Sequence, residues 1–304
     1  MHLGNVMCAL LAWLSVRAKN GTMLLRIEDL DPMRCPLSFA EILEEDLLWL
    51  GLDWDEGGLK GTDRYGETCI QSYRSEFYES ELARLREVAH LYPCFCSRAE
   101  LHAAQAPHLS DGRVLYAGTC RGLTDAEVAE KLKKRGAATR IAVPDETITF
   151  TDLVRGEYSE NLVAECGDFI LRRSDGVFAY QLAVVADDIK MGVTEIIRGS
   201  DLLTSTARQI WLCRILGGEV PQFGHIPLLL APDGRRLSKR DADLDLTALR
   251  KRCTAEDIIG MLAFLCGLIE KEEPCKASEL IPIFSWDKVK KEDIRLTEAF
   301  YNGR

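Results

Sequence analysis

Two groups of residues, one near each end of the sequence, carry side chains suited to holding a phosphate group. His2 and Gly4 stand where a segment with apolar residues at helical spacing begins. A helix starting there points the positive end of its dipole and free backbone N–H groups at an anion, and glycine lets the anion come close. Lys239 stands in the basic run of residues 236–240, and a lysine on a loop can neutralise charge on a departing phosphate. Either group alone is a weak signal, but in this order the two predict phosphate chemistry.

Three acidic residues follow the short apolar segment of residues 22–27. Glu28, Asp29 and Asp31 all fall within four positions. Carboxylates at the end of a strand need a positive partner, and in open α/β sheets ligands bind at that edge. The partner could be the ammonium group of a substrate or a structural arginine such as Arg34, and the spacing alone leaves both open.

A tyrosine and an arginine mark two further segments of the same character. Tyr180 stands ahead of an apolar run that ends in two aspartates, and Arg198 ends another apolar segment. An arginine in this position can bind a carboxylate through two parallel hydrogen bonds. The alternative for Arg198 is an internal ion pair with Asp187 or Asp201.

Three of the eleven cysteines have spacing that suits a metal ion. Cys94 and Cys96 are separated by one residue, and Cys120 follows later in the chain. Tetrahedral zinc prefers thiolate and imidazole ligands. His102 or His108 could compete as a ligand, and three reduced thiols near a turn are the alternative. The remaining cysteines are scattered through a chain of ordinary core composition, as expected for reduced core residues.

The elements that would position these residues alternate between helix and strand. Helical patterns cover residues 6–19, 38–50, 73–90 and 202–216, and strand patterns lie within residues 22–27 and 189–198. This alternation predicts a doubly wound α/β catalytic domain. From about residue 244 onward strand patterns cease and helical patterns take over, which predicts a small helical domain.

Composition and charge restrict the class of protein. With 304 residues, 47% of them hydrophobic, the chain can bury a sizeable core. It has no apolar run long enough for a transmembrane helix, and its start lacks a basic leader and a cleavage site. We therefore expect a cytoplasmic protein without a membrane partner. The formal charge of −10 argues against a protein that coats nucleic acid without regard to sequence. Any RNA would therefore bind a local basic patch. The basic runs 131–135 and 288–291 are each more typical of a solvated helix face.

Four stretches resemble the glutamyl-tRNA synthetase group of class I aminoacyl-tRNA synthetases. They are residues 26–32 (RIEDLDP), 178–188 (FAYQLAVVADD), 195–209 (EIIRGSDLLTSTARQ) and 237–246 (LSKRDADLDL). The groups around His2 and Lys239 likewise resemble the HIGH and KMSKS motifs of that class. Arg236 stands where KMSKS has its first lysine. An arginine keeps the positive charge but spreads it over a planar guanidinium, whereas a lysine carries it on one compact ammonium group, so we expect an altered affinity for ATP.

Within that group the chain is more similar to a short paralogue family, the glutamyl-Q tRNA(Asp) synthetases. The similarity covers nearly the whole chain, and residues 198–203 follow the R-G-x-D-L-L pattern of the paralogues. A C-terminal anticodon-binding domain like that of full-length glutamyl-tRNA synthetases is not expected. The resemblance implies a ligase that uses ATP, with its Mg²⁺, to convert glutamate to glutamyl-adenylate without needing tRNA. A hydroxyl of queuosine in the anticodon of tRNA(Asp) would then attack the adenylate.

The same resemblance implies roles for individual residues. The ATP-binding residues would be His2, Gly4, Asn5, Arg236, Ser238 and Lys239. Of these, His2, Gly4 and Lys239 would be catalytic, acting through positioning and charge stabilisation. Glutamate would be bound by Glu28 at its amino group, by Arg198 at a carboxylate and by Tyr180 through packing and a hydrogen bond.

The resemblance also implies a structural zinc ion and a division into domains. Cys94, Cys96, Tyr116 and Cys120 would bind the zinc. The fold would be a Rossmann-like class I synthetase catalytic domain with an inserted zinc-binding subdomain and a small C-terminal helical domain. The expected boundaries are 1–91 and 161–243 for the two halves of the catalytic domain, 92–160 for the inserted, acceptor-facing subdomain, and 244–304 for the helical domain.

One departure from the family affects the expected activity. Members have a strand and loop resembling R-F-A-P-S-P-T-G before the HIGH motif, whereas this sequence begins one residue before His2. We expect about half of the amino-acid pocket to be missing and Met1 to be an internal methionine of a longer protein. The alternatives are a truncated glutamyl-tRNA synthetase that charges tRNA(Glu) and a non-catalytic, synthetase-like binding protein. We expect a monomer in each case.

Overall fold

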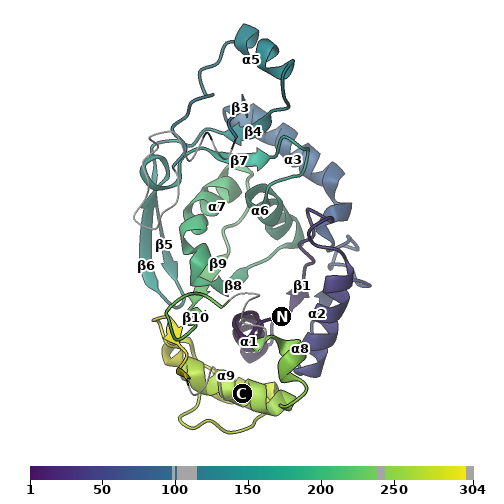
Figure 1. The fold of residues 1–304 in the computed structure, drawn as a ribbon, viewed down its shortest axis with the longest axis vertical. Helices are drawn as coiled ribbons and strands as arrows, with labels where there is room; N and C mark the ends of the chain where they lie inside the picture. The colour runs from purple at the N-terminus through teal and green to yellow at the C-terminus, as the bar shows by residue number, and fades with distance from the viewer. Residues whose placement is uncertain (98–99, 101–114, 238–243, 299–304) are drawn as a thin grey trace.

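The structure is a computed structural model that describes residues 1–97, 100, 115–237 and 244–298. Its helices are α1 (Leu3–Ala18), α2 (Ser38–Trp49), α3 (Ser75–Val88), α5 (Asp125–Leu132), α6 (Tyr180–Met191), α7 (Leu203–Ile215), α8 (Leu246–Leu249), α9 (Ala255–Cys266) and α10 (Ala277–Leu280). In Figure 1, α5 lies at one end of the long axis and α9 near the other. No helix in the described part of the chain is both long and apolar enough to cross a membrane.

The strands in the described residues are short and form five small sheets. They are β1 (Leu24–Leu25), β2 (Glu56–Gly57), β3 (Leu91–Cys94), β4 (Ala138–Ile141), β5 (Thr147–Asp152), β6 (Gly156–Asn161), β7 (Phe169–Arg172), β8 (Glu195–Gly199), β9 (Gln222–Ile226), β10 (Leu229–Leu230) and β11 (Ile294–Arg295). The pairs β1–β2, β8–β9 and β10–β11 are parallel, whereas β3–β4–β7 and β5–β6 are antiparallel. The α/β class is therefore as predicted, but the described strands do not join into one doubly wound sheet.

Two hydrophobic cores hold the helices in place. The larger core surrounds α1, whose side chains are buried on nearly every side and pack with residues of α2 and α9. A helix that is apolar all round is stable only inside such a core. The second core joins α3, α6 and α7, and α6 and α7 lie next to each other in Figure 1. The first core thus fixes the start of α1, and the second fixes the start of α6.

A channel separates the parallel pair β1–β2 from the parallel pair β8–β9. Its volume is about 480 Å³, and it is lined by residues of α1, β1 and β8. β1 pairs only with β2 and β8 only with β9, and the described residues include no strand between β1 and β8. We call this space the strand channel. The edges of β1 and β8 that face it consequently have no ladder partner among the described residues.

The C-terminal part of the described chain returns to pair with β10. Helices α8, α9 and α10 agree with the helical patterns predicted after residue 244, but a strand follows them. β11 pairs with β10, and Asp293 just before it accepts hydrogen bonds from the Leu228 backbone at 3.0 Å and the Ser200 hydroxyl at 3.3 Å. It also pairs with Arg155 at 3.1 Å. This segment therefore fastens loops that come from distant parts of the sequence.

Candidate active site

The phosphate-binding residues predicted near the start of the chain form the N-terminus of α1. His2 is the N-cap residue: its ring accepts a hydrogen bond from the Asn5 backbone N–H, and the Asn5 side chain accepts one from the His2 backbone N–H, both at 3.4 Å. This reciprocal arrangement satisfies two of the donors that a helix start leaves unpaired. The helix begins at Leu3, three residues earlier than predicted, because the histidine itself caps it.

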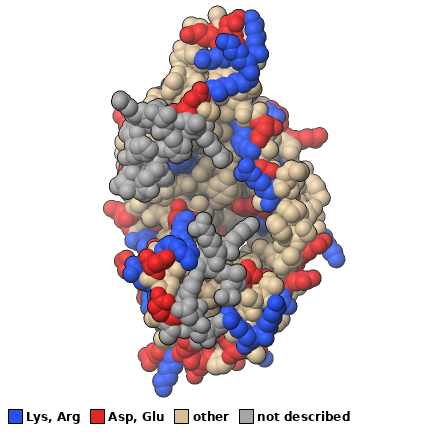
Figure 2. Space-filling view, in the orientation of Figure 1, with Lys and Arg blue, Asp and Glu red and all other residues tan. Residues whose placement is uncertain are grey.

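A cavity of about 330 Å³ opens beside this helix start. We call it the His2 cavity; its lining includes His2, Gly4, Asn5, Cys8, Arg198, Gly199, Asp201, Leu202, Arg236, Leu237 and residues 226–229. Arg236 pairs with Asp201 at 2.8 Å across its rim. Ser238 and Lys239 lie outside the described residues. The predicted ATP-binding residues that are described therefore line one space, and Figure 2 shows that this side of the molecule is hollowed near its centre, with charged side chains around the hollow.

Two of the acidic residues after β1, Glu28 and Asp31, have positive partners within the chain. Arg26 pairs with Glu28 at 3.0 Å and with Asp188 at 2.6 Å. Asp31 pairs with Arg173 at 2.9 Å, closer than its 3.6 Å contact with Arg34. The structural arginine considered from the sequence is thus only one of several.

Among these carboxylates, Glu28 remains open to a ligand. Its side chain is 39% exposed and lines the strand channel. By contrast, the Asp29 carboxylate is buried and accepts hydrogen bonds from the backbone and hydroxyl of Ser72. The strand channel and the His2 cavity share Asn5 and Cys8, so Glu28 faces a space that adjoins the His2 cavity.

The three residues expected to bind glutamate are neighbours. Tyr180 is the first residue of α6, Arg198 lies in β8, and each interacts electrostatically with the other and with Glu28. Burial raises the pKa of the Tyr180 phenol above its ordinary value, so this side chain is a neutral hydrogen-bonding group at neutral pH. The structure thus brings an acid, a phenol and a guanidinium together from three segments far apart in sequence.

Arg198 does not form the internal ion pair considered from the sequence. Its Nε donates to His225 Nε2 at 3.0 Å, and its Nη2 donates to Thr206 Oγ1 at 2.9 Å. His225 in turn contacts Asp152 through Nδ1 at 2.6 Å. Neither His225 nor Asp152 was predicted, because 73 residues separate them. The one available signal was a histidine inside the short run Phe223–Ile226, which is otherwise without polar side chains.

Acid is expected to destabilise the fold through His225. Burial, followed by the charge of Arg198, lowers the pKa of this histidine below 6.5, although its hydrogen bond to Asp152 opposes the shift. As the pH falls, the unfolded chain takes up the proton before the folded chain does. The contribution of His225 to the free energy of unfolding is therefore complete above pH 6.5 and decreases as the pH drops below 6.5. Urea denaturation at pH 7.5 and 5.5 measures the difference. The variant His225→Gln should lose most of it; an equal pH effect in that variant would assign the effect to other groups.

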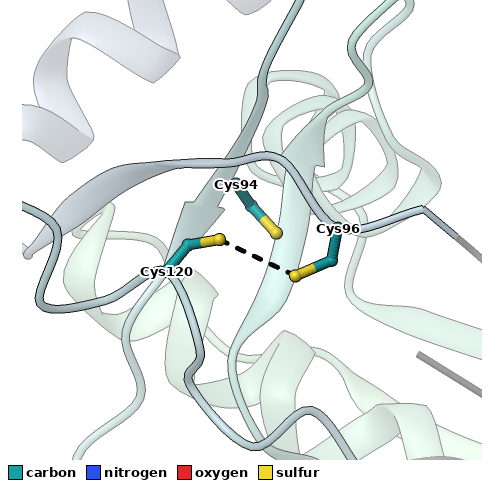
Figure 3. Close-up of side chains that lie close together, drawn as sticks. All are labelled: Cys94, Cys96 and Cys120. Atoms are coloured by element: carbon teal, nitrogen blue, oxygen red, sulfur yellow. Dashed lines mark hydrogen bonds between the residues drawn. The ribbon is translucent and has the colours of Figure 1, made fainter. Parts of the chain in front are cut away.

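Three predicted metal ligands converge in the part of the chain around β3. The Sγ atoms of Cys94, Cys96 and Cys120 lie within 4.8 Å of one another, and Figure 3 shows the three side chains pointing toward a common centre. The Tyr116 hydroxyl oxygen accepts from the Cys120 backbone N–H at 2.8 Å and lies 3.5 Å from Cys94 Sγ. His102 and His108 lie outside the described residues. This group of side chains could hold a metal ion.

The protonation of these thiols fits that possibility. Burial and the neighbouring Cys94 raise the pKa of Cys96 to about 12. Burial also acts on Cys94, but hydrogen bonds from Tyr116 and the Cys96 backbone outweigh it and lower the pKa of Cys94. A second negative charge in this group is therefore costly without a cation, and a bound metal ion would supply one.

Comparison with known proteins places this geometry in a family. The model of class I tRNA synthetases (E and Q), catalytic domain, matches residues 1–294. A glutamyl-Q tRNA(Asp) synthetase of Symbiobacterium thermophilum is 49% identical over 97% of this chain and 92% of its own length. That of Nitratidesulfovibrio vulgaris is 45% identical over 94% of this chain and 88% of its own.

A solved structure agrees with these relatives. The glutamate-tRNA synthetase of Elizabethkingia anophelis superposes with a TM-score of 0.83 at 30% identity, covering all of this chain and 67% of that one. The chain therefore belongs to the class I tRNA synthetases of the glutamate and glutamine type, in the group of the glutamyl-Q tRNA(Asp) synthetases.

Proposed function

We propose that this chain activates glutamate with ATP and transfers it to queuosine in the anticodon of tRNA(Asp). One observation carries the proposal: Arg198 lines the cavity that His2 and Arg236 also line, and it interacts electrostatically with Glu28 and Tyr180. An ammonium group, a carboxylate and a triphosphate would each meet a side chain of suitable charge there. Membership of the glutamyl-Q tRNA(Asp) synthetase group supports glutamate as the amino acid and queuosine as the acceptor.

The residues act on the first step by holding and polarising the two substrates. Glu28 binds the glutamate ammonium group, Arg198 a carboxylate, and Tyr180 packs against the amino acid and donates a hydrogen bond. The start of α1, with His2, Gly4 and Asn5, receives the phosphates, while Arg236, Ser238 and Lys239 bind the pyrophosphate side, and Mg²⁺ arrives with ATP. The glutamate α-carboxylate attacks the α-phosphorus in line, pyrophosphate leaves, and glutamyl-adenylate forms. No protein nucleophile is needed, because positioning and charge stabilisation lower the barrier.

The domain organisation follows the expected boundaries in this proposal. Residues 1–91 and 161–243 form the catalytic domain, residues 92–160 form an acceptor-facing insertion, and residues 244–304 form a helical domain. The helices α8, α9 and α10 support the last of these. All the proposed substrate-binding residues come from one chain, so a monomer suffices.

The three-cysteine group is proposed to hold a structural zinc ion. Three thiolates bound to one tetrahedral zinc stand about 3.8 Å apart, and Cys96 Sγ and Cys120 Sγ are already 3.7 Å apart. Cys94, Cys96, Cys120 and Tyr116 would be the ligands. The metal would neutralise the thiolates and tie the strand end at Cys94 to the loop at Cys120.

Removing one ligand is expected to remove the metal. Cys96→Ser should lower the zinc content from about one per chain to near zero and reduce the melting temperature, because folding and metal binding are coupled. Cys35, which is exposed and far from this group in sequence, provides the control, and Cys35→Ser should keep its zinc. Elemental analysis by mass spectrometry after dialysis measures the content. Zinc retained in Cys96→Ser would exclude these ligands.

A methyl group at Gly4 is expected to impair ATP binding without unfolding the protein. A Cβ atom there would stand 3.1 Å from His2 Cε1 and 3.2 Å from its Nδ1, so the ring must move by a few tenths of an ångström. Misplacement on this scale should raise the KM for ATP about tenfold. Alanine favours helix over glycine by about 1 kcal/mol, so the melting temperature should hold or rise. An unchanged KM for ATP would place the nucleotide elsewhere.

Glutamate-dependent exchange of pyrophosphate into ATP, run without tRNA, tests the proposed activation step. Glutamine and aspartate serve as controls, and a version carrying the upstream strand of the relatives is assayed in parallel. Exchange with glutamate in either form supports the proposal. The second step is tested by transfer of labelled glutamate to tRNA(Asp) with queuosine, tRNA(Asp) without it, and tRNA(Glu). If both forms are folded and neither shows exchange, the result would favour a binding protein. Transfer to tRNA(Glu) alone would favour a glutamyl-tRNA synthetase.

A further inference from the structure

A buried hydrogen-bond chain stands behind Arg198, on the side away from the His2 cavity. It runs from Arg198 to His225 and on to Asp152, and Thr206 closes it through contacts with both Arg198 and His225 Nε2. His225 and Thr206 are fully buried, and Asp152 is 2% exposed. These polar groups are costly to bury unless each has a partner. Here they partner one another, and the chain ends on a residue that lines the cavity.

The direction of each hydrogen bond can be assigned from the arginine. A guanidinium only donates, so His225 Nε2 must accept the hydrogen bond from Arg198 Nε. The proton of the neutral ring then sits on Nδ1 and is donated to Asp152 Oδ2. The other carboxylate oxygen, Oδ1, accepts from the backbone N–H groups of Val154, Arg155 and His225. Asp152 is thus held from one side by the backbone and fixes the histidine tautomer on the other.

We propose that His225, oriented by Asp152, is a positioning residue that sets the angle at which Arg198 presents its guanidinium to the glutamate carboxylate. The inference rests on the proposed function and extends it to two residues with no assigned role. An arginine binds a carboxylate well only when its planar fork faces that group. Anchoring Nε on His225 and Nη2 on Thr206 fixes the plane of the fork in advance, which reduces the ordering that substrate binding would otherwise require.

The charged and titratable groups that face His225 all agree with this arrangement. They are Asp152 at the end of β5, Arg155 just after it, whose Nε donates to the His225 carbonyl at 3.3 Å, and Arg198 in β8. Thr206 of α7 is the remaining polar contact. Two of these groups are cations and one is an anion, so a protonated ring would be repelled by both arginines and would lose its acceptor for Arg198 Nε.

Asp152→Asn tests the proposal without touching Arg198. The amide keeps its oxygen for the three backbone N–H groups and turns its NH₂ group toward His225 Nδ1. The ring must then carry its proton on Nε2, opposite the Arg198 N–H. We expect the KM for glutamate in pyrophosphate exchange to rise about tenfold, equivalent to one charge-assisted hydrogen bond, with the KM for ATP unchanged. His225→Phe should behave alike, and His225→Gln, which retains an acceptor, should recover part of the loss.

A matched variant separates positioning from loss of stability. Asp168 is another buried aspartate, and it accepts from Tyr92, Arg121 and the Val143 backbone. Asp168→Asn should lower stability without changing the KM for glutamate. Equal rises in the KM values for glutamate and ATP in Asp152→Asn, or a rise for glutamate in Asp168→Asn, would overturn the proposal. If neither the unsubstituted chain nor its extended form shows exchange, the proposed function fails, and the tautomer is still decided by the spectroscopic test below.

Nitrogen-15 NMR of histidine-labelled protein provides a readout that does not depend on activity. The His225 ring proton should be found on Nδ1 in the unsubstituted chain and on Nε2 in Asp152→Asn. His225→Gln identifies the resonance by its disappearance. A proton on Nε2 in the unsubstituted chain would mean that the ring cannot accept from Arg198, which would overturn the assignment whatever the exchange assay shows.

Discussion

Arg198→Lys is expected to lower kcat/KM for glutamate by about a hundredfold or more, because it removes two charge-assisted hydrogen bonds and the planar fork at once. The arginine donates hydrogen bonds from Nε to His225 and from Nη2 to Thr206, and it also lines the His2 cavity. A lysine has one nitrogen on a flexible stem, so it cannot hold both partners and meet a carboxylate in a fixed plane. Steady-state pyrophosphate exchange with glutamate varied at saturating ATP measures the effect.

Arg17 supplies the control for this substitution. It also binds two partners, Asp53 at 3.0 Å and Asp55 at 2.7 Å, and is mostly buried, but it lies at the far end of α1. Arg17→Lys should leave kcat/KM for glutamate unchanged. A loss of only a few-fold in Arg198→Lys, with folded protein confirmed by circular dichroism, would show that Arg198 does not bind the glutamate carboxylate.

The largest loss of stability is expected from Asp187→Asn. The Asp187 carboxylate is fully buried and accepts from Gln71 Nε2 at 2.9 Å, Arg74 Nε at 2.8 Å and the Tyr78 hydroxyl at 2.8 Å. Neutralising it leaves the buried Arg74 without its main counter-charge. Breaking one partner of a buried pair costs about 3 kcal/mol, so the free energy of unfolding should fall by that amount. Guanidinium denaturation should show a lower midpoint with an unchanged slope.

A surface ion pair offers the comparison. Asp175 pairs with Arg173 at 2.5 Å, but its side chain is 51% exposed, and pairs of that kind contribute little. Asp175→Asn should therefore leave the denaturation midpoint nearly unchanged. Comparable losses in the two variants would mean that burial of Asp187 is not what makes its ion pair important.

Several helices were predicted because their signal is local, although α6 (Tyr180–Met191) was not among them. The patterns at residues 73–90 and 202–216 match α3 (Ser75–Val88) and α7 (Leu203–Ile215) within two residues. The N-cap of α2 is Leu37, which makes no side-chain hydrogen bond, although the neighbouring Ser38 is of a type that favours the cap position. Periodicity reports which face of a helix is buried, but the choice of cap depends on how the preceding loop enters, and no spacing records that.

The strand predicted at residues 22–27 is shorter in the structure, because a strand needs partners from elsewhere in the chain. The apolar segment 22–27 gives only Leu24–Leu25 as β1. One edge pairs with β2, and the other faces the strand channel. A side-chain pattern indicates that a segment could be buried on both faces, but the ladder forms only where a neighbouring strand supplies hydrogen bonds.

The site was predictable as a set of residues but not as a set of contacts. The types and order of His2, Glu28, Tyr180 and Arg198 matched a known pattern, and the structure brings the last three together. Their supporting partners were missed, because ion pairs and hydrogen bonds between separate helices and strands leave no local pattern in the sequence. Arg26 and Asp188, 162 positions apart, are one example.

Asp293 and β11 come late in the chain but contact Ser200, Leu228 and β10, which come much earlier. The ribosome therefore makes β8, β9 and β10 before the segment that holds them in place. A nascent chain halted before residue 293 would carry the His2 cavity without the hydrogen bond that Asp293 accepts from Leu228, one of the residues that line it.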